Sequence, residues 1–171
     1  MWQSIRKAFG IAAGPTYIRS LRRQEVIGSP IRRVRYEYRV KSIDGWLDVG
    51  QTYFTLESAV SFGIPNSGDD AFQAVKVPYG SRSLPTEDRN RLVGDYIVDA
   101  YRCLHEGEES GEQAVLQLAS GAFVTEIAAA PHGTGSVGLY VRSPAEWEAM
   151  AREWDEGFTL VSFWAPRPSP Q

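Results

Sequence analysis

The sequence contains a single cysteine, Cys103, among 171 residues. An internal disulfide is therefore excluded, and this cysteine usage is typical of proteins that fold in a reducing compartment. No apolar run approaches the roughly 20 residues of a membrane-spanning helix. The N-terminus shows no continuous secretory signal, because glycine and proline interrupt it early. We therefore expect a cytoplasmic protein without a membrane span.

Signatures of catalysis and of metal binding are also missing. The chain has two histidines, His105 and His132, and no H-E-x-x-H, G-x-S-x-G or Walker-type motif. Cys103 and His105 fall at the end of a predicted helix, where residues two apart point to different sides. We predict no metal, no cofactor and no catalytic residue, which favours a protein that is not an enzyme. An enzyme with an unrecognised site stays open, and a deep pocket holding Asp95, Asp99 or His132 would favour it.

One glycine-rich stretch, Gly133–Gly138, has the spelling G-x-G-x-x-G. In a dinucleotide site such a stretch opens a helix, so that the pyrophosphate meets the helix N-terminus. Here a predicted strand over residues 139–142 follows instead. We therefore interpret the stretch as a flexible hairpin loop, and the sequence does not indicate whether it binds anything.

What the chain does contain predicts a folded domain with a substantial sheet. Hydrophobic residues make up 43% and aromatic residues 12%, enough for a real core. The clearest strand covers residues 33–41, where apolar or aromatic residues alternate with charged ones. Asp44-Gly45 is a turn signal, and residues 46–54 are predicted to return as its partner. Further strands are predicted over residues 71–78, 114–118, 122–128, 138–142 and 158–164.

Helices are predicted from apolar residues that recur three and four positions apart. They cover residues 2–12, 15–27, 56–62, 86–104 and a segment that begins at Pro144. The last has the sharpest start, because Ser143 and Glu146 form a capping box around Pro144. We therefore expect an α+β fold, a single domain with a mainly antiparallel sheet and two to three helices packed on one face. The predicted divisions are a basic, helical N-terminal arm (1–31), the α+β domain (32–164) and a Pro-rich tail (165–171).

Charge is unevenly distributed along the chain. Residues 1–41 carry ten Lys/Arg and two acids, a net charge of +8, whereas residues 42–171 carry eight Lys/Arg and nineteen acids, a net charge of −11. Such a split indicates either a basic arm for an anionic partner or two halves that neutralise each other.

Our leading hypothesis is a non-enzymatic binding protein that acts through a protein–protein surface, as an inhibitor, an immunity-type partner or a regulator does. An acidic body suits a basic protein partner, because complementary charge speeds association. The oligomeric state is not indicated. The candidate partner-binding acids are Asp69, Asp70, Glu106, Glu108, Glu109 and Glu112. The alternative is nucleic-acid binding through an arginine-rich segment, with candidate anion-binding residues Arg19, Arg22, Arg23, Arg32 and Arg33.

Overall fold

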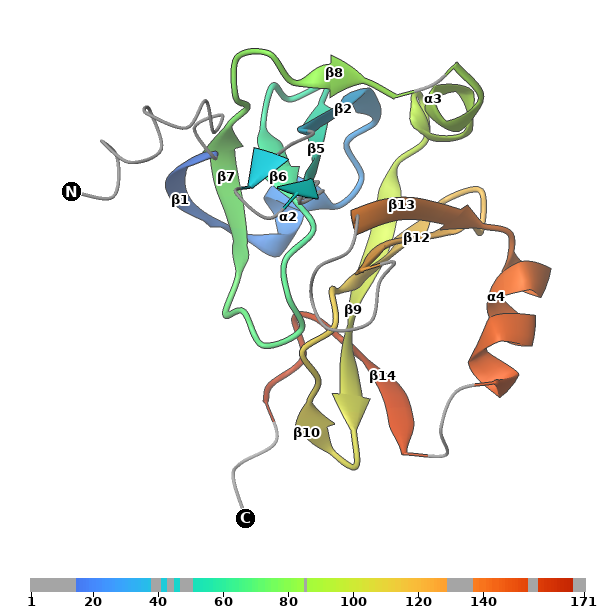
Figure 1. Ribbon diagram of the computed structural model, residues 1–171. Helices are drawn as coiled ribbons and strands as arrows, with labels where there is room; N and C mark the ends of the chain where they lie inside the picture. Colours follow the sequence, from blue (N-terminus) through green and yellow to red (C-terminus); the bar gives the residue numbers. More distant parts are fainter. Residues whose placement is uncertain are drawn as a thin grey trace.

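The structure is a computed structural model that describes residues 15–37, 41–42, 45–46, 51–84, 86–128, 137–153 and 157–167. Figure 1 shows a protein built mostly from β-strands. All of the described strand pairs are antiparallel, and they form two six-stranded sheets and one short two-stranded pair. The predicted α+β fold class is therefore wrong, because most of the described secondary structure lies in the sheets and not in helices.

The first sheet has the strand order β1-β7-β6-β5-β2-β8. Its strands are Thr16–Leu21 (β1), Ile31–Glu37 (β2), Gln51–Leu56 (β5), Ser61–Gly63 (β6), Phe72–Lys76 (β7) and Arg82–Ser83 (β8). The predicted pairing of β2 with the segment that follows it is confirmed, with Val34 opposite Phe54 and both buried. In the sequence, the short antiparallel pair Lys41–Ser42 (β3) and Gly45–Trp46 (β4) comes between β2 and β5.

The second sheet is organised around its longest strand, β9. Its strands are Ile97–His105 (β9), Glu108–Glu109 (β10), Val115–Leu118 (β11), Phe123–Ala128 (β12), Val137–Arg142 (β13) and Phe158–Ser162 (β14). β9 pairs with β10 and β11, and also with β14. The predicted hairpin of β11 and β12 and the predicted strands at β13 and β14 are confirmed.

One hydrophobic core lies between the two sheets. Buried phenylalanines run through it, with ring centroids 5.9 Å apart for Phe54 and Phe62, 5.4 Å for Phe62 and Phe72, and 4.9 Å for Phe72 and Phe163. The first three belong to the first sheet, and Phe163 follows β14 in the second. Burial of each such side chain contributes about 1.5–3 kcal/mol, so these rings join the two sheets energetically.

Helices are few in the described residues, and they are short. They are Arg23–Val26 (α2), Thr86–Leu92 (α3) and Pro144–Arg152 (α4). α4 packs on the second sheet through Trp147, and the described residues form no layer of two to three helices on one sheet face. None of these described helices has the length and apolar character needed to cross a membrane.

The predicted helix over residues 86–104 is correct only for its first part. α3 ends at Leu92, Gly94 adopts a positive φ of 93°, and the chain continues as β9. The apolar residues of this segment fit a helical stripe as well as a strand. Arg102 points inward from β9 and interrupts the alternation of apolar and polar residues that identifies a strand.

The predicted helical N-terminal arm is also wrong where the structure describes it. Residues 15–27 form β1 and the four-residue helix α2, and β1 pairs with β7. The β-branched and aromatic residues of β1 favour a pleated strand. The predicted helix over residues 2–12 lies outside the described residues. The predicted helix over residues 56–62 is instead a turn, with Ala59 at a φ of 65°, that leads into β6.

The predicted start of α4 is confirmed in detail. The Glu146 N–H donates to the Ser143 hydroxyl at 3.3 Å, and the Ser143 N–H donates to the Glu146 carboxylate at 2.7 Å. These bonds hold the pKa of Glu146 below its ordinary value. Of the apolar residues on this helix, Trp147 is buried and Met150 is half-buried.

Candidate functional site

The outer face of the second sheet carries the candidate site. Along β9, Ala100 and Leu104 belong to the core, whereas Tyr101 and Cys103 belong to a separate cluster on the opposite face. Trp147 of α4 completes this outer cluster. Its ring stacks on Phe123 of β12 with centroids 4.8 Å apart and an interplanar angle of 20°. This contact holds the first half of α4 on the sheet.

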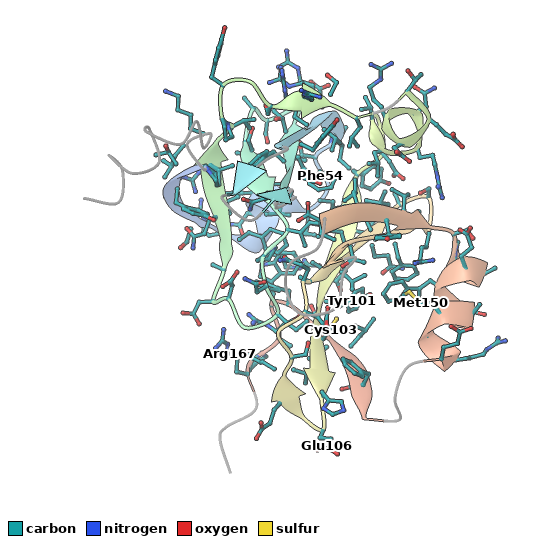
Figure 2. All side chains as sticks on the ribbon, viewed as in Figure 1. Phe54, Tyr101, Cys103, Glu106, Met150 and Arg167 are labelled. Atoms are coloured by element: carbon teal, nitrogen blue, oxygen red, sulfur yellow. The ribbon has the colours of Figure 1, made fainter. Side chains whose placement is uncertain are left out.

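An apolar pocket lies between α4 and the sheet. Figure 2 shows Met150 of α4 on the side of the helix that faces Tyr101 and Cys103 of β9. The pocket has a volume of about 290 Å³ and is lined by Cys103, Glu112, Gln113, Val115, Thr125, Trp147, Met150 and Phe158. This volume is close to the lower limit of roughly 300 Å³ for pockets that hold small ligands.

An acidic recess adjoins the apolar pocket. It has a volume of about 370 Å³ and is lined by His105, Glu108, Glu109, Ser110, Gly111, Glu112 and Phe158. Glu112 and Phe158 line both spaces, so the pocket and the recess are neighbours, and we refer to them together as the cleft. The rings of His105 and Phe158, which both line the recess, have centroids 4.9 Å apart.

Next to the recess, Arg102 joins distant parts of the chain through hydrogen bonds. Its side chain is buried, and its guanidinium lies 4.0 Å from the centre of the Phe163 ring. It donates to the carbonyl oxygens of Ser67 at 2.6 Å, Asp69 at 2.8 Å and Phe163 at 3.0 Å. Burial and the neighbouring Arg167 lower the pKa of this guanidinium from its ordinary value. Arg102 thereby attaches the loop over residues 66–70 to β9.

Ser67 also attaches the loop over residues 66–70 to β9. This residue is fully buried, and its hydroxyl accepts the Cys103 N–H at 2.8 Å. Its own N–H donates to the Glu112 carbonyl oxygen at 2.8 Å. The two acidic segments that the sequence singled out, residues 66–70 and 106–112, therefore lie side by side.

The structure divides the six candidate acids into two sets. Glu109, Asp70 and Asp69 have internal partners. Glu109 pairs with Arg102 at 3.4 Å and with Arg167 at 3.2 Å, Asp70 pairs with Arg167 at 2.9 Å, and the Asp69 carboxylate accepts the Asn66 N–H at 2.8 Å. The other set consists of the exposed residues Glu106, Glu108 and Glu112. In the part of the chain that the structure describes, no basic side chain lies within 4.0 Å of their carboxylates.

Three of the five candidate arginines are engaged near the N-terminal end of the described chain. The Arg19 guanidinium forms a bidentate ion pair with the Glu25 carboxylate, with N–O distances of 2.6 and 3.1 Å. The Arg22 guanidinium lies 3.4 Å from the same carboxylate. The hydrogen bond from the Arg19 side chain, followed by the hydrogen bond from the Arg22 backbone N–H, lowers the pKa of Glu25 to about 2. Arg23 lies over the ring of Trp164, 5.6 Å from its centre.

The other two candidate arginines, Arg32 and Arg33, are both exposed. An irregularity between Ile31 and Arg33 in the pairing of β2 with β5 interrupts the strand alternation there. Neither guanidinium has an ion-pair partner among residues 15–37, 41–42, 45–46, 51–84, 86–128, 137–153 and 157–167. Among the described residues, the acids of the cleft therefore form no ion pair with the five candidate arginines.

Cys103 and His105 differ from their predicted arrangement. In β9, residues two apart share a face, so these side chains line neighbouring parts of the cleft and do not diverge as in a helix. Burial raises the pKa of the Cys103 thiol to about 11, which disfavours the reactive thiolate. In the described ranges, no three His, Cys, Asp or Glu side chains are grouped so as to hold a metal ion.

Two of the three residues that would have favoured an enzyme, Asp95 and Asp99, lie outside the cleft. The Asp95 carboxylate accepts the Tyr96 N–H at 2.8 Å, and the Asp99 carboxylate accepts the Ala100 N–H at 2.9 Å. Neither lines the cleft. His132 and most of the glycine-rich stretch, residues 133–136, lie outside the described residues.

Sequence reasoning missed the apolar half of the cleft, because Cys103 and Phe158 are expected to line one pocket only if β9 is recognised as a strand. The alternation of Tyr101, Cys103 and His105 is the signal that would have found it.

No family model, no curated protein and no solved structure matches this chain. The cleft is therefore interpreted from its own chemistry.

Proposed function

We propose that this protein is a non-enzymatic binding protein that recognises a segment of another protein in its cleft. The observation that supports this is an apolar pocket that shares Glu112 and Phe158 with an acidic recess. A partner residue with a long apolar side chain would enter the pocket beneath Met150. A neighbouring Lys or Arg of the partner would meet the carboxylates of Glu108 and Glu112.

The two halves of the cleft would contribute differently to binding. Burial of one large apolar side chain is worth about 1.5–3 kcal/mol, whereas an exposed ion pair is worth roughly 0–1 kcal/mol. The apolar pocket would therefore supply most of the affinity. The carboxylates of Glu106, Glu108 and Glu112 would attract basic partners and select against acidic ones. Binding should consequently weaken with added salt, but salt should not abolish it.

A random peptide library selected on the immobilised protein tests this function. We expect selected peptides to be rich in Lys or Arg next to Leu, Met or Phe. Met150→Arg should abolish their binding because it places a charge in the pocket. The double variant Glu108→Lys with Glu112→Lys should weaken binding about tenfold at low salt.

Glu148→Lys is the matched control, because Glu148 lies on the exposed side of α4 with a side chain 69% exposed. Its peptide affinity should equal that of the unmodified protein. The proposal fails if no peptide is enriched, or if the selected peptides bind the Met150→Arg variant as tightly as the unmodified protein.

Nucleic-acid binding is the second candidate function, and it is supported by the exposure of Arg32 and Arg33 side by side. Binding to duplex or single-stranded DNA should fall by roughly 0.7–0.9 log units per phosphate contact for each log unit of salt. Arg32→Glu combined with Arg33→Glu should abolish it. DNA binding that is absent at low salt, or unchanged in the double variant, would contradict this candidate.

A further inference from the structure

One edge of the second sheet, formed by β14, lies next to the cleft, since Phe158 lines both of its parts. We infer that the segment binds as an additional β-strand along the edge of β14 that faces away from β9 and places alternate side chains in the cleft. This inference rests on the proposed function and adds the conformation and the residue spacing of the ligand.

The hydrogen-bonding direction of β14 follows from its register with β9. Antiparallel pairs run from Phe158 opposite His105 to Ser162 opposite Tyr101. In the same register, the Glu106 N–H donates to the Gly157 carbonyl oxygen at 2.9 Å, and the Phe163 N–H donates to the Ala100 carbonyl oxygen at 2.7 Å. Because hydrogen-bonded pairs alternate with non-hydrogen-bonded pairs, residues 157, 159, 161 and 163 direct their backbone groups toward β9.

The backbone N–H and C=O of Leu160 consequently point away from β9. Within the described residues, β14 has no strand partner other than β9, so this side of it is a sheet edge. Such an edge is a ready template for an added strand, and main-chain hydrogen bonds then supply affinity without regard to sequence.

The side chains of β14 explain why this edge suits the cleft. Phe158 lines the apolar pocket and the recess, and Leu160 packs against the cluster that contains Cys103. An added strand would lie about 4.8 Å from β14, and every second side chain would face the same way as these two. A long apolar side chain near Leu160 would reach the pocket. A Lys or Arg two positions along would lie beside Phe158, whose ring lines the acidic recess.

An extended segment fits this space better than a helix. A helix with its side chains is about 10–12 Å across, whereas the pocket holds about 290 Å³ beneath α4. Only single side chains can enter it. The expected recognition pattern is therefore an apolar residue and a basic residue two positions apart.

Hydrogen exchange measured residue by residue tests the strand, with a synthetic peptide of alternating Lys and Leu as the probe. In the free protein, the Leu160 amide should exchange quickly and the Val161 amide slowly, because only Val161 is bonded to β9. Saturation with the peptide should slow exchange at Leu160 by at least about tenfold and leave Val161 nearly unchanged. Exchange at Leu160 that is already slow in the free protein, or that is unchanged in the complex, would overturn the inference.

Backbone N-methylation of the same peptide gives a second measurement. Methylation of one alternating set of residues should abolish binding, and methylation of the other set should have little effect, because only one set faces β14. If both sets are equally sensitive or equally tolerant, the added strand is wrong while peptide binding in the cleft stands. If neither this peptide nor any library-selected peptide binds, the proposed function itself fails, and the inference fails with it.

Discussion

Replacement of Arg102 by methionine tests the hydrogen-bond network that attaches the loop over residues 66–70 to β9. Methionine approximates the length of the side chain but removes every hydrogen bond that the guanidinium makes. The carbonyl oxygens of Ser67, Asp69 and Phe163 then lose donors at 2.6, 2.8 and 3.0 Å. The loop over residues 66–70 should detach from β9 as a result.

The expected loss of stability follows from these contacts. A buried acceptor left without a donor costs about 1–3 kcal/mol. The Asp69 carbonyl is only partly buried, so water can replace its donor at a smaller cost. Contact of the guanidinium with the Phe163 ring contributes about 1–2 kcal/mol when the group is desolvated. Since the loop can relax, we expect the free energy of unfolding to fall by about 3–5 kcal/mol, in the range known for broken buried charge networks.

Urea unfolding followed by tryptophan fluorescence measures this change. Arg102→Lys keeps the charge but not the planar fork of donors, so it should lose about 1–3 kcal/mol. Arg89→Met is the control, since Arg89 is exposed on α3, and its effect should stay within about 0.5 kcal/mol. A loss below about 1 kcal/mol for Arg102→Met, with an unchanged m value, would refute the argument.

Three further predictions concern single side chains. Glu126 is buried and accepts the N–H of Thr52 from the other sheet, and burial raises its pKa from about 4.5 to about 7. The folded state then holds the proton more tightly than the unfolded state, so stability should fall by up to about 3 kcal/mol as the pH rises from 4.5 to 7. Glu126→Gln should remove this fall, and equal urea midpoints for the unmodified protein at pH 5 and pH 8 would contradict it. Ser143→Ala should destabilise the protein by about 1 kcal/mol in the same assay, whereas Ser143→Asp should retain the cap. Cys103, the only thiol, should react with a disulfide reagent far more slowly in the native protein than in urea, and equal rates would show that it is not buried.

Elements with strong local signals were predictable from the sequence. The start of α4 was predicted correctly because Ser143, Pro144 and Glu146 specify a helix N-terminus through contacts within one turn. The pairing of β2 with β5 was also predicted, because a strand with one wet face alternates visibly along the chain. These signals need no knowledge of distant residues.

Residues 97–105 were assigned to a helix because their local signal is ambiguous. Apolar residues there recur at helical spacing, and Arg102 occupies a position that a buried strand would normally give to an apolar residue. This arginine is tolerated inside because carbonyl oxygens 33, 35 and 61 residues away along the chain accept its hydrogen bonds. No pattern within the segment reveals those acceptors.

The candidate acids were identified from composition, but their roles came from the tertiary structure. Sequence reasoning named Asp69, Asp70 and Glu109 together with Glu106, Glu108 and Glu112, and it had no means of separating them. Arg167, in the predicted Pro-rich tail, pairs with Asp70 and Glu109. Such pairing depends on where the chain returns in space, which residue type and spacing do not encode.

The sequence alone determined that no internal disulfide forms, where α4 begins, which segments alternate as half-exposed strands, and that the two parts of the chain differ in charge. Only the tertiary structure decided that residues 97–105 form a strand, with Cys103 and His105 on one face and Arg102 on the other. The physical reason is that helix caps and strand alternation are local, whereas strand pairing and the burial of a charge depend on partners far away in the chain. The cleft beneath α4 is a product of those distant contacts.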